Sequence, residues 1–458
     1  MITMARDLPL LWPEILVLLA GAGALACEML RLPRTALAVA TALLLAATAL
    51  SLPLLSLDTT VFGGTFRVDA LSVWAKLILL PATVLALLLA RAELAGSDRE
   101  GTVYALLCFT SFGALVLAGS GDTMFLVLGV LLSGLGAFAL VAYPRDDAAT
   151  EAAMKFFVFA SVAGAVMVFG LSYWFGATGT TLLDDLATPG LPPAAIAIGL
   201  AGMIVGLGYK ASLAPFHFWA PDAYEGAPVS VAAYLSVVPK IGALFALAQV
   251  ARDLPPGSGW SGAVAAVAVL TMTWGYLAAL VQDNLVRLLA YSSIAQAGYF
   301  LLGIVAVGAS PLALLSLVLF GAAYAAMNLG AFAIIQRSGR TLESFAGLGR
   351  ARPAVGVAMV LFLLSLTGIP PLAGFVGKLL LFGAAIDANH TWLAVIAIVN
   401  SVLSLAVYLR IVVALYRQPA GAPGVPAGGA LVTLVWVAAL AATLLIGLAA
   451  QPLLAPLV

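Results

Sequence analysis

Residues 206–228, GLGYKASLAPFHFWAPDAYEGAP, place a lysine and a helix interruption inside a long apolar run. Pro215 follows Lys210 by five residues and removes a helical hydrogen bond there. Residues 366–382, LTGIPPLAGFVGKLLLF, repeat the arrangement around Lys378, where the breaking residues are Gly368, Pro370, Pro371, Gly374 and Gly377. Backbone groups freed at membrane depth must be hydrogen-bonded by protein or by water in a cavity. Both stretches therefore predict discontinuous membrane helices.

The composition makes lipid the solvent of the whole chain. Of 458 residues, 64% are hydrophobic and 9% are charged, whereas a soluble domain carries about 25% charged residues. The net charge is zero, so no basic surface suggests nucleic acid as a partner. Cys27 and Cys108 lie inside apolar runs and are interpreted as small buried hydrophobic residues. No metal-ligand spacing or nucleotide-binding glycine motif appears, so we expect no cofactor in this chain.

Apolar runs of about 20 residues are long enough to span a bilayer as helices. The sequence predicts a single membrane domain over 1–458 with about fourteen such helices, and the seventh and twelfth are the discontinuous ones. The expected spans are 12–30, 35–57, 69–90, 101–119, 123–143, 153–176, 193–216, 228–251, 261–281, 288–308, 311–336, 354–385, 391–416 and 429–450.

The two interrupted spans stand at matching places in the chain. Paired Gly/Pro-interrupted spans indicate an inverted-repeat transporter. Spans seven and twelve are five apart, which predicts one five-helix repeat over 101–251 (helices 4–8) and an inverted one over 261–416 (helices 9–13). Residues 1–100 would supply helices 1–3, and 429–450 helix 14. In the alternative interpretation, the prolines only kink helices for packing.

Basic residues in the links predict the orientation. If the N-terminus is outside, eleven arginines face the cytoplasm, and Arg6, Arg67 and Arg252 face the other side. This bias follows the positive-inside rule and places both termini on the periplasmic side. The eleven are Arg31, Arg34, Arg91, Arg99, Arg145, Arg287, Arg337, Arg340, Arg350, Arg352 and Arg417.

The lysines avoid these links. A charge at mid-membrane costs at least about 2.5–3.5 kcal/mol and usually marks an ion path. Lysine can lose its proton when it is desolvated, whereas arginine cannot. We therefore expect Lys210, Lys240 and Lys378 to carry protons. His217, which follows the first break, is interpreted equally well as a structural histidine or as a proton-exchanging one.

Two other lysines have simpler explanations. Lys155 lies four residues after Glu151, and an ion pair along one helix explains both residues as well as a place in the proton path does. Lys76 lies seven residues into the third span, where reaching towards the membrane surface stays open beside an ion path.

Three stretches resemble the antiporter-like subunits of complex I, the NADH:quinone oxidoreductases. They are KASLAPFHFWAPDAYEGAP (210–228), QDNLVRLLAYSSIAQAGY (282–299) and TGIPPLAGFVGK (367–378), and the last is most similar to the N subunit. The resemblance covers nearly the whole chain, including Pro13–Glu14 and YLRIVVALY at 408–416.

The resemblance implies a proton-translocating subunit of the bacterial inner membrane, with a hydrophilic axis through Lys210, Lys240 and Lys378. It implies K-type and M-type neighbours, the lateral helix of an L-type subunit, and lipids as partners. NADH, FMN, iron–sulfur clusters and quinone would belong to other subunits.

Three positions depart from the family pattern. Val130 stands where the family has a glutamate that pairs with the lysine of span seven, Arg287 where it often has lysine, and Gln296 where it often has histidine. An arginine cannot alternate its protonation, and an amide cannot carry charge. Two alternatives to a proton-pumping subunit of complex I stay open. The chain would belong to a multi-subunit cation/proton antiporter or membrane-bound hydrogenase, or it would be a non-pumping structural subunit because of Val130.

Overall fold

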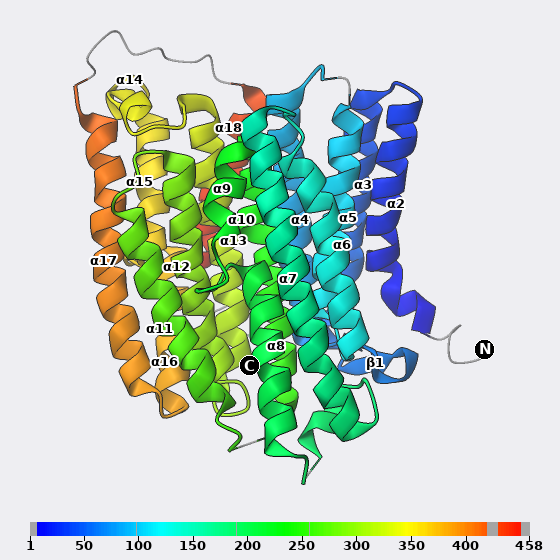
Figure 1. Cartoon of the computed structure of the whole chain (residues 1–458). Coiled ribbons are helices and arrows are strands. Elements are labelled where there is room, and N and C mark those ends of the chain that lie inside the picture. Colours follow the sequence, from blue (N-terminus) through cyan, green and yellow to red (C-terminus); the bar gives the residue numbers. More distant parts are fainter. Residues whose placement is uncertain (1–6, 98, 189, 256, 419–428, 450–458) are drawn as a thin grey trace.

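The computed structural model describes residues 7–97, 99–188, 190–255, 257–418 and 429–449. Within them, long helices stand side by side in one bundle (Figure 1). Arg6, which enters the charge comparison, and residue 450, the expected end of the last span, lie outside the described residues.

The expected spans are found as helices in the same order along the chain. The long helices are α2 (Trp12–Met29), α3 (Pro33–Ser51), α4 (Ala70–Leu94), α5 (Glu100–Ala118), α6 (Thr123–Val141), α7 (Asp147–Thr178), α8 (Pro193–Ala211), α10 (Val229–Asp253), α11 (Trp260–Ala279), α12 (Leu285–Val305), α13 (Leu312–Ser338), α15 (Pro353–Thr367), α16 (Ala373–Asp387), α17 (Thr391–Tyr416) and α18 (Ala430–Leu448). The short elements are η1 (Leu8–Leu11), η2 (Leu52–Ser56), β1 (Thr59–Val61), η3 (Phe62–Gly64), β2 (Phe66–Val68), η4 (Asp184–Ala187), α9 (Trp219–Gly226), η5 (Glu343–Phe345) and α14 (Leu348–Ala351).

The number of spans agrees with the prediction once the broken twelfth span is counted. Among the described residues, 13 helices are long and apolar enough to cross a membrane. Helices α15 and α16 have 15 residues each, which is short for a span. They flank the interruption after Thr367 and together occupy the place of the expected span 354–385. The all-α membrane fold is therefore confirmed.

Polar residues in the short links start several of these helices. Asp69, Asp122, Asp146 and Asn284 each precede a helix, and each side chain accepts a hydrogen bond from a backbone N–H of the first turn. Such caps satisfy donors that have no partner inside the helix. These four residues therefore stabilise the starts of α4, α6, α7 and α12.

A small antiparallel hairpin between the second and third spans was not predicted. Thr59–Val61 pairs with Phe66–Val68 at the end of the bundle where β1 is marked in Figure 1. Phe66 is buried against the bundle, and a Cβ at Gly119 would lie 2.4 Å from its ring. The hairpin therefore packs against the end of α5 and does not cross the membrane.

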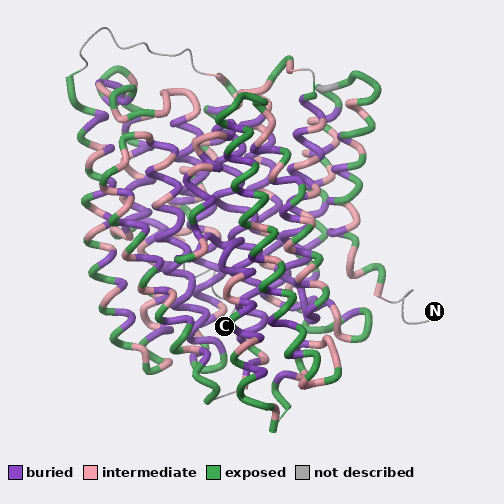
Figure 2. Tube along the Cα trace, viewed as in Figure 1, coloured by how far each residue is buried: buried purple, intermediate pink, exposed green. Residues whose placement is uncertain are grey.

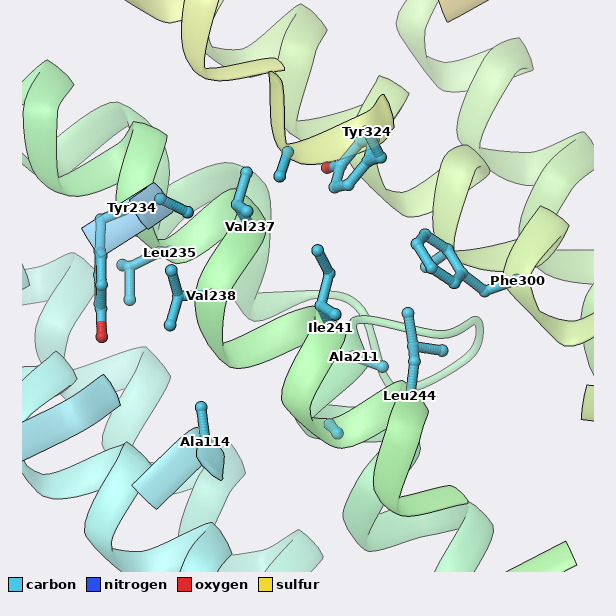
Figure 3. Close-up of a cluster of buried hydrophobic side chains, with 14 of the residues drawn as sticks. Ala114, Ala211, Tyr234, Leu235, Val237, Val238, Ile241, Leu244, Phe300 and Tyr324 are labelled. Carbon is cyan, nitrogen blue, oxygen red and sulfur yellow. The ribbon is translucent and has the colours of Figure 1, made fainter. Parts of the chain in front are cut away.

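The core surrounds α10. Every residue from Val229 to Ala251 is buried, and Figure 3 shows Ile241 and Leu244 of this helix among the buried side chains. The peripheral helices instead expose large apolar side chains, for example Val162, Val402 and Leu445. Figure 2 shows the same pattern, with buried residues at the centre and exposed ones outside. An apolar exterior fits lipid as the surrounding solvent.

Candidate functional site

The first break separates α8 from α9. Helix α8 ends at Ala211, Ser212 adopts the left-handed conformation at φ 59°, and α9 begins at Trp219. Pro215 lies inside this break, as predicted. The Ala214 N–H donates to Thr271 Oγ1 at 3.1 Å, so the protein itself satisfies part of the freed backbone.

Lys210 lies in the last turn of α8, and its side chain is enclosed. The residue is 1% exposed, and its Nζ donates to the carbonyl of Ser133 on α6 at 2.7 Å. Helix α6 contains no acidic residue, and Val130 lies partly buried one turn before Ser133. Within the described residues, Lys210 therefore has a carbonyl where the family pattern has a carboxylate.

The second break separates α15 from α16. Gly368 ends α15 in the left-handed conformation at φ 94°, and Pro370 and Pro371 lie in the five-residue interruption that ends at Leu372. The prediction that Gly377 and Gly374 break the helix is wrong, because both lie inside α16, and Gly374 is in its first turn. A Cβ there would lie 1.8 Å from the carbonyl oxygen of Ser365, so glycine permits close packing of the two half-helices.

Lys378 reaches back to the end of α15. It is 2% exposed, and its Nζ donates to the carbonyls of Leu366 and Thr367, each at 3.0 Å. The amine also lies 4.0 Å from the ring centroid of Tyr299, within cation–π range. The residue lines a cavity of about 260 Å³ between α16 and α17, and the exposed side chain of Val402 lines it too.

Lys240 lies on the central helix α10. It is 1% exposed, and its Nζ donates to Ser293 Oγ on α12 at 2.6 Å. Its amine lies 5.6 Å from the ring centroid of Tyr224, which comes from α9 just after the first break. Lys240 therefore faces α12, which leads towards Lys378.

Polar groups on α12 connect the contacts of Lys240 with those of Lys378. Gln296 lies one turn after Ser293, and its Nε2 donates to the Leu366 carbonyl at 2.9 Å and to Tyr408 OH at 3.2 Å. The same Leu366 carbonyl accepts from Lys378. Sequence reasoning missed Ser293, Leu366 and Tyr408. The signals for Ser293 and Tyr408 were the serine pair before Gln296 and the tyrosine that opens residues 408–416, whereas the Leu366 carbonyl has no sequence signal.

His217 lies in the first break and is 4% exposed. Its ring packs against Phe218, and its Nδ1 is buried without a hydrogen-bond partner in the described part of the chain. A structural histidine would be held in place by hydrogen bonds of its ring. The unpartnered Nδ1 of His217 does not support that interpretation.

Lys155, Glu151 and Arg287 belong to an ionic cluster around α9. Lys155 Nζ lies 2.7 Å from Glu151 and 3.0 Å from Asp222, and its side chain is 45% exposed. Arg287 pairs with Asp222 at 2.7 Å and with Glu225 at 2.8 Å. The ion pair expected between Lys155 and Glu151 is confirmed, and Arg287 holds α9 against the start of α12.

Lys76 is not at the membrane surface. It is 1% exposed, and its Nζ lies 2.9 Å from Glu14 Oε1, which joins α4 to α2. The interpretation of Lys76 as a residue that reaches out to the headgroups is therefore wrong.

Arg410 lies within the membrane helix α17, where its charge needs a partner. It pairs with Asp283 at 2.8 Å.

A second ionic cluster closes the hairpin end of the bundle. Arg67 of β2 lies 2.5 Å from Asp184 and 2.6 Å from Asp253, and its side chain is 8% exposed. Arg252 pairs with Asp69. Burial raises the pKa of the Asp69 carboxyl, but the Ser72 N–H, Arg252 and Gln249 outweigh this effect and lower the pKa overall. This cluster ties the hairpin to the ends of α4 and α10.

Arg67→Ala should therefore destabilise the protein. Removing one partner of a buried ion pair typically costs about 3–5 kcal/mol, because the other charge stays uncompensated. We expect the thermal unfolding midpoint in detergent, followed by circular dichroism, to fall by several degrees. Arg145→Ala is the matched control, since Arg145 is exposed and forms no ion pair in the described residues. An equal midpoint for both variants would contradict a stabilising role of the cluster.

Taken together, the broken helices and the enclosed lysines are those of an antiporter-like membrane subunit. The sequence profile of the family described as "NADH:quinone oxidoreductase/Mrp antiporter, TM" matches residues 120–404. The chain is 40% identical over 366 residues to NADH-quinone oxidoreductase subunit N of Mycobacterium sp. (strain JLS), covering 79% of this chain and 78% of the relative. It is 41% identical over 451 residues to subunit N of Desulfovibrio desulfuricans, covering 90% and 87%.

Solved structures agree with this assignment. The bundle matches a chain of respiratory complex I from Thermus thermophilus with bound aureothin at a TM-score of 0.86 and 31% identity, covering 97% of this chain and 98% of that one. A chain of the Mrp complex from Dietzia sp. DQ12-45-1b matches at 0.86 and 23% identity, covering 99% and 96%, which shows a common fold alone. The chain belongs to the family of NADH-quinone oxidoreductase N subunits.

Proposed function

We propose that this chain moves protons through Lys210, Lys240 and Lys378 and carries out no redox chemistry itself. One observation carries the proposal. All three amines are buried, and none forms an ion pair within the described residues. A lysine without a fixed anion in an apolar surrounding is poised to alternate between its charged and neutral forms. A permanently paired lysine is held in its charged form.

The contacts support a continuous path between Lys240 and Lys378. Lys240 donates to Ser293, and Lys378 and Gln296 share the Leu366 carbonyl, so only about one helical turn of α12 separates the two sets of contacts. The Gln296 amide cannot carry the proton charge, so water must carry it past this residue. The buried and unpartnered Gln296 Oε1 offers an acceptor for such a water.

The remaining site residues receive secondary roles. His217 would exchange protons beside the first break, because its free Nδ1 is aimed at no protein partner in the described chain. Lys155 and Glu151 would act as an exposed structural pair rather than as members of the proton path, since Lys155 pairs with Glu151 and joins α7 to α9 through Asp222. Arg287 would stay charged and act as a structural tie, because it pairs with two carboxylates.

The architecture supports the same proposal. Helices α5–α10 and α11–α17 would form the inverted repeats 101–251 and 261–416, with 1–100 and 429–450 flanking them. The chain would lie in a bacterial inner membrane with both termini in the periplasm. K-type and M-type subunits and the lateral helix of an L-type subunit would be its neighbours. NADH, FMN, iron–sulfur clusters and quinone would be bound by other subunits.

One observation favours a second candidate, a structural subunit that does not pump. Helix α6 provides no carboxylate to Lys210, and Val130 occupies the place of the family's glutamate. In this case the fold and the interfaces would be kept, while the first lysine would no longer respond to the adjacent subunit.

Lys240→Arg tests the proposal, because it keeps the positive charge and removes the ability to lose it. We expect the variant to lose proton transport as fully as Lys240→Ala does. The measurement is acidification of inverted membrane vesicles that contain the assembled complex, with electron transfer followed in parallel. Wild-type acidification in the Lys240→Arg variant would contradict proton transfer through Lys240 and favour the structural-subunit candidate.

A further inference from the structure

A small cavity lies at the end of the bundle that carries α14. It has a volume of about 60 Å³ and is lined by two arginines that come from different elements. Arg337 lies in the last turn of α13, and Arg352 immediately precedes α15. Thr433 and Trp436 of α18 are among the other lining residues. Figure 1 shows α14 and the start of α18 at this same end.

The two arginines have no counter-charge in the described structure. Neither forms an ion pair there, and Arg337 Nε is buried without a hydrogen-bond partner. Residues 419–428, PAGAPGVPAG, which precede Gly429 in the sequence, include no acidic residue. Other partly enclosed arginines, such as Arg67 and Arg287, meet carboxylates. An enclosed guanidinium without an anion is unfavourable, so this cavity calls for an anionic ligand.

The cavity also offers hydrogen-bond donors suited to a phosphate. One guanidinium group can donate two parallel N–H hydrogen bonds to the oxygens of a phosphate. Helix α18 begins at Ala430 with Gly429 before it, and no side chain caps its first N–H groups. Uncapped N–H groups at a helix N-terminus attract anions. Thr433, whose hydroxyl can also donate a hydrogen bond, lines the cavity as well.

The surroundings distinguish a lipid from a free anion. Trp436 lines the cavity, and tryptophan is enriched at the headgroup level of membranes. Beyond it, α18 exposes Leu434, Val437 and Leu445, which form an apolar track along which an acyl chain can lie. Basic pockets between membrane helices on the arginine-rich side bind lipid headgroups. We propose that this cavity binds the phosphate of an anionic phospholipid whose acyl chain lies along α18.

The test uses the purified full-length chain, delipidated in detergent and titrated with dioleoylphosphatidylglycerol or dioleoylphosphatidylcholine under native mass spectrometry. The anionic lipid should bind in preference to the zwitterionic one. A basic residue near the membrane surface contributes about 1 kcal/mol, so Arg337→Gln and Arg352→Gln should each weaken phosphatidylglycerol binding about five-fold. Arg350→Gln is the matched control, since Arg350 of α14 is exposed and does not line the cavity.

Two further variants and a competition experiment complete the test. Arg337→Lys keeps the charge and should bind phosphatidylglycerol more tightly than Arg337→Gln, while unchanged circular dichroism shows that both are folded. Equal affinity for the two lipids, or wild-type affinity in the Arg337→Gln/Arg352→Gln double variant, would overturn the proposal. Displacement of bound phosphatidylglycerol by inorganic phosphate at equal concentration would overturn the lipid assignment and indicate a soluble anion instead.

Discussion

Replacing Lys378 by alanine is expected to reduce proton-coupled quinone reduction by at least about ten-fold, because a positioned proton-transfer group contributes about 10²–10⁴ in rate. Lys378 is enclosed beside the second break and contacts the carbonyls that end α15. Alanine removes the amine and leaves no titratable side chain at this point of the path. Steady-state turnover in membranes that contain the assembled complex measures the effect.

The matched control for this variant is Lys155→Ala. Lys155 is also a lysine of a membrane helix, but its side chain is 45% exposed and its contacts are ion pairs at the solvent boundary. Its loss should change turnover far less. Exposed pairs contribute about 0–1 kcal/mol, so the fold should survive. If both variants lose the same activity, a general requirement for lysine charge would explain the data better than a path through Lys378.

Introducing a carboxylate by Val130→Glu is expected to change turnover about ten-fold, the equivalent of about 1.4 kcal/mol. Val130 lies one turn before Ser133, whose carbonyl accepts from Lys210, so a glutamate there shares a helix face with the contact to the amine. The new anion would stabilise the charged form of Lys210. Whether turnover rises or falls shows whether charging or discharging this amine limits the cycle.

Val130→Gln controls for size and polarity without adding charge. Its turnover should stay near that of the wild type, since an amide does not create an ion pair. An unchanged turnover in Val130→Glu would contradict this account of the departure at Val130. It would indicate that an acidic residue of a neighbouring subunit already pairs with Lys210.

The fold was largely predictable because a bilayer imposes a length on each apolar run. Helix α17 coincides with the expected span 391–416, and α10 begins within one residue of the expected 228. The breaks were predictable because proline cannot donate a backbone hydrogen bond. Gly374 was placed wrongly, since glycine also permits close helix packing and composition alone does not separate the two roles. The β1–β2 hairpin was missed because its short strands lack a clear pattern.

The candidate site was predictable only in part. Lysines in apolar runs stand out in any sequence, so Lys210, Lys240 and Lys378 were found. Backbone acceptors such as the Leu366 carbonyl carry no sequence signal, because every residue has one. The pairing of Lys76 with Glu14 depends on how α2 packs near α4, and neither residue indicates the other in the sequence. The charged residues of the site could therefore be predicted from the sequence, whereas their contact partners depend on tertiary packing.

The most direct measurement of the central claim is the number of protons moved per electron in proteoliposomes. The complex would be reconstituted with either the wild-type chain or a chain in which Lys210, Lys240 and Lys378 are replaced by alanine. The proton path described above predicts a lower ratio for the variant at any rate of electron transfer that remains. An unchanged ratio, in a complex that still contains the variant chain, would contradict proton transfer through these lysines.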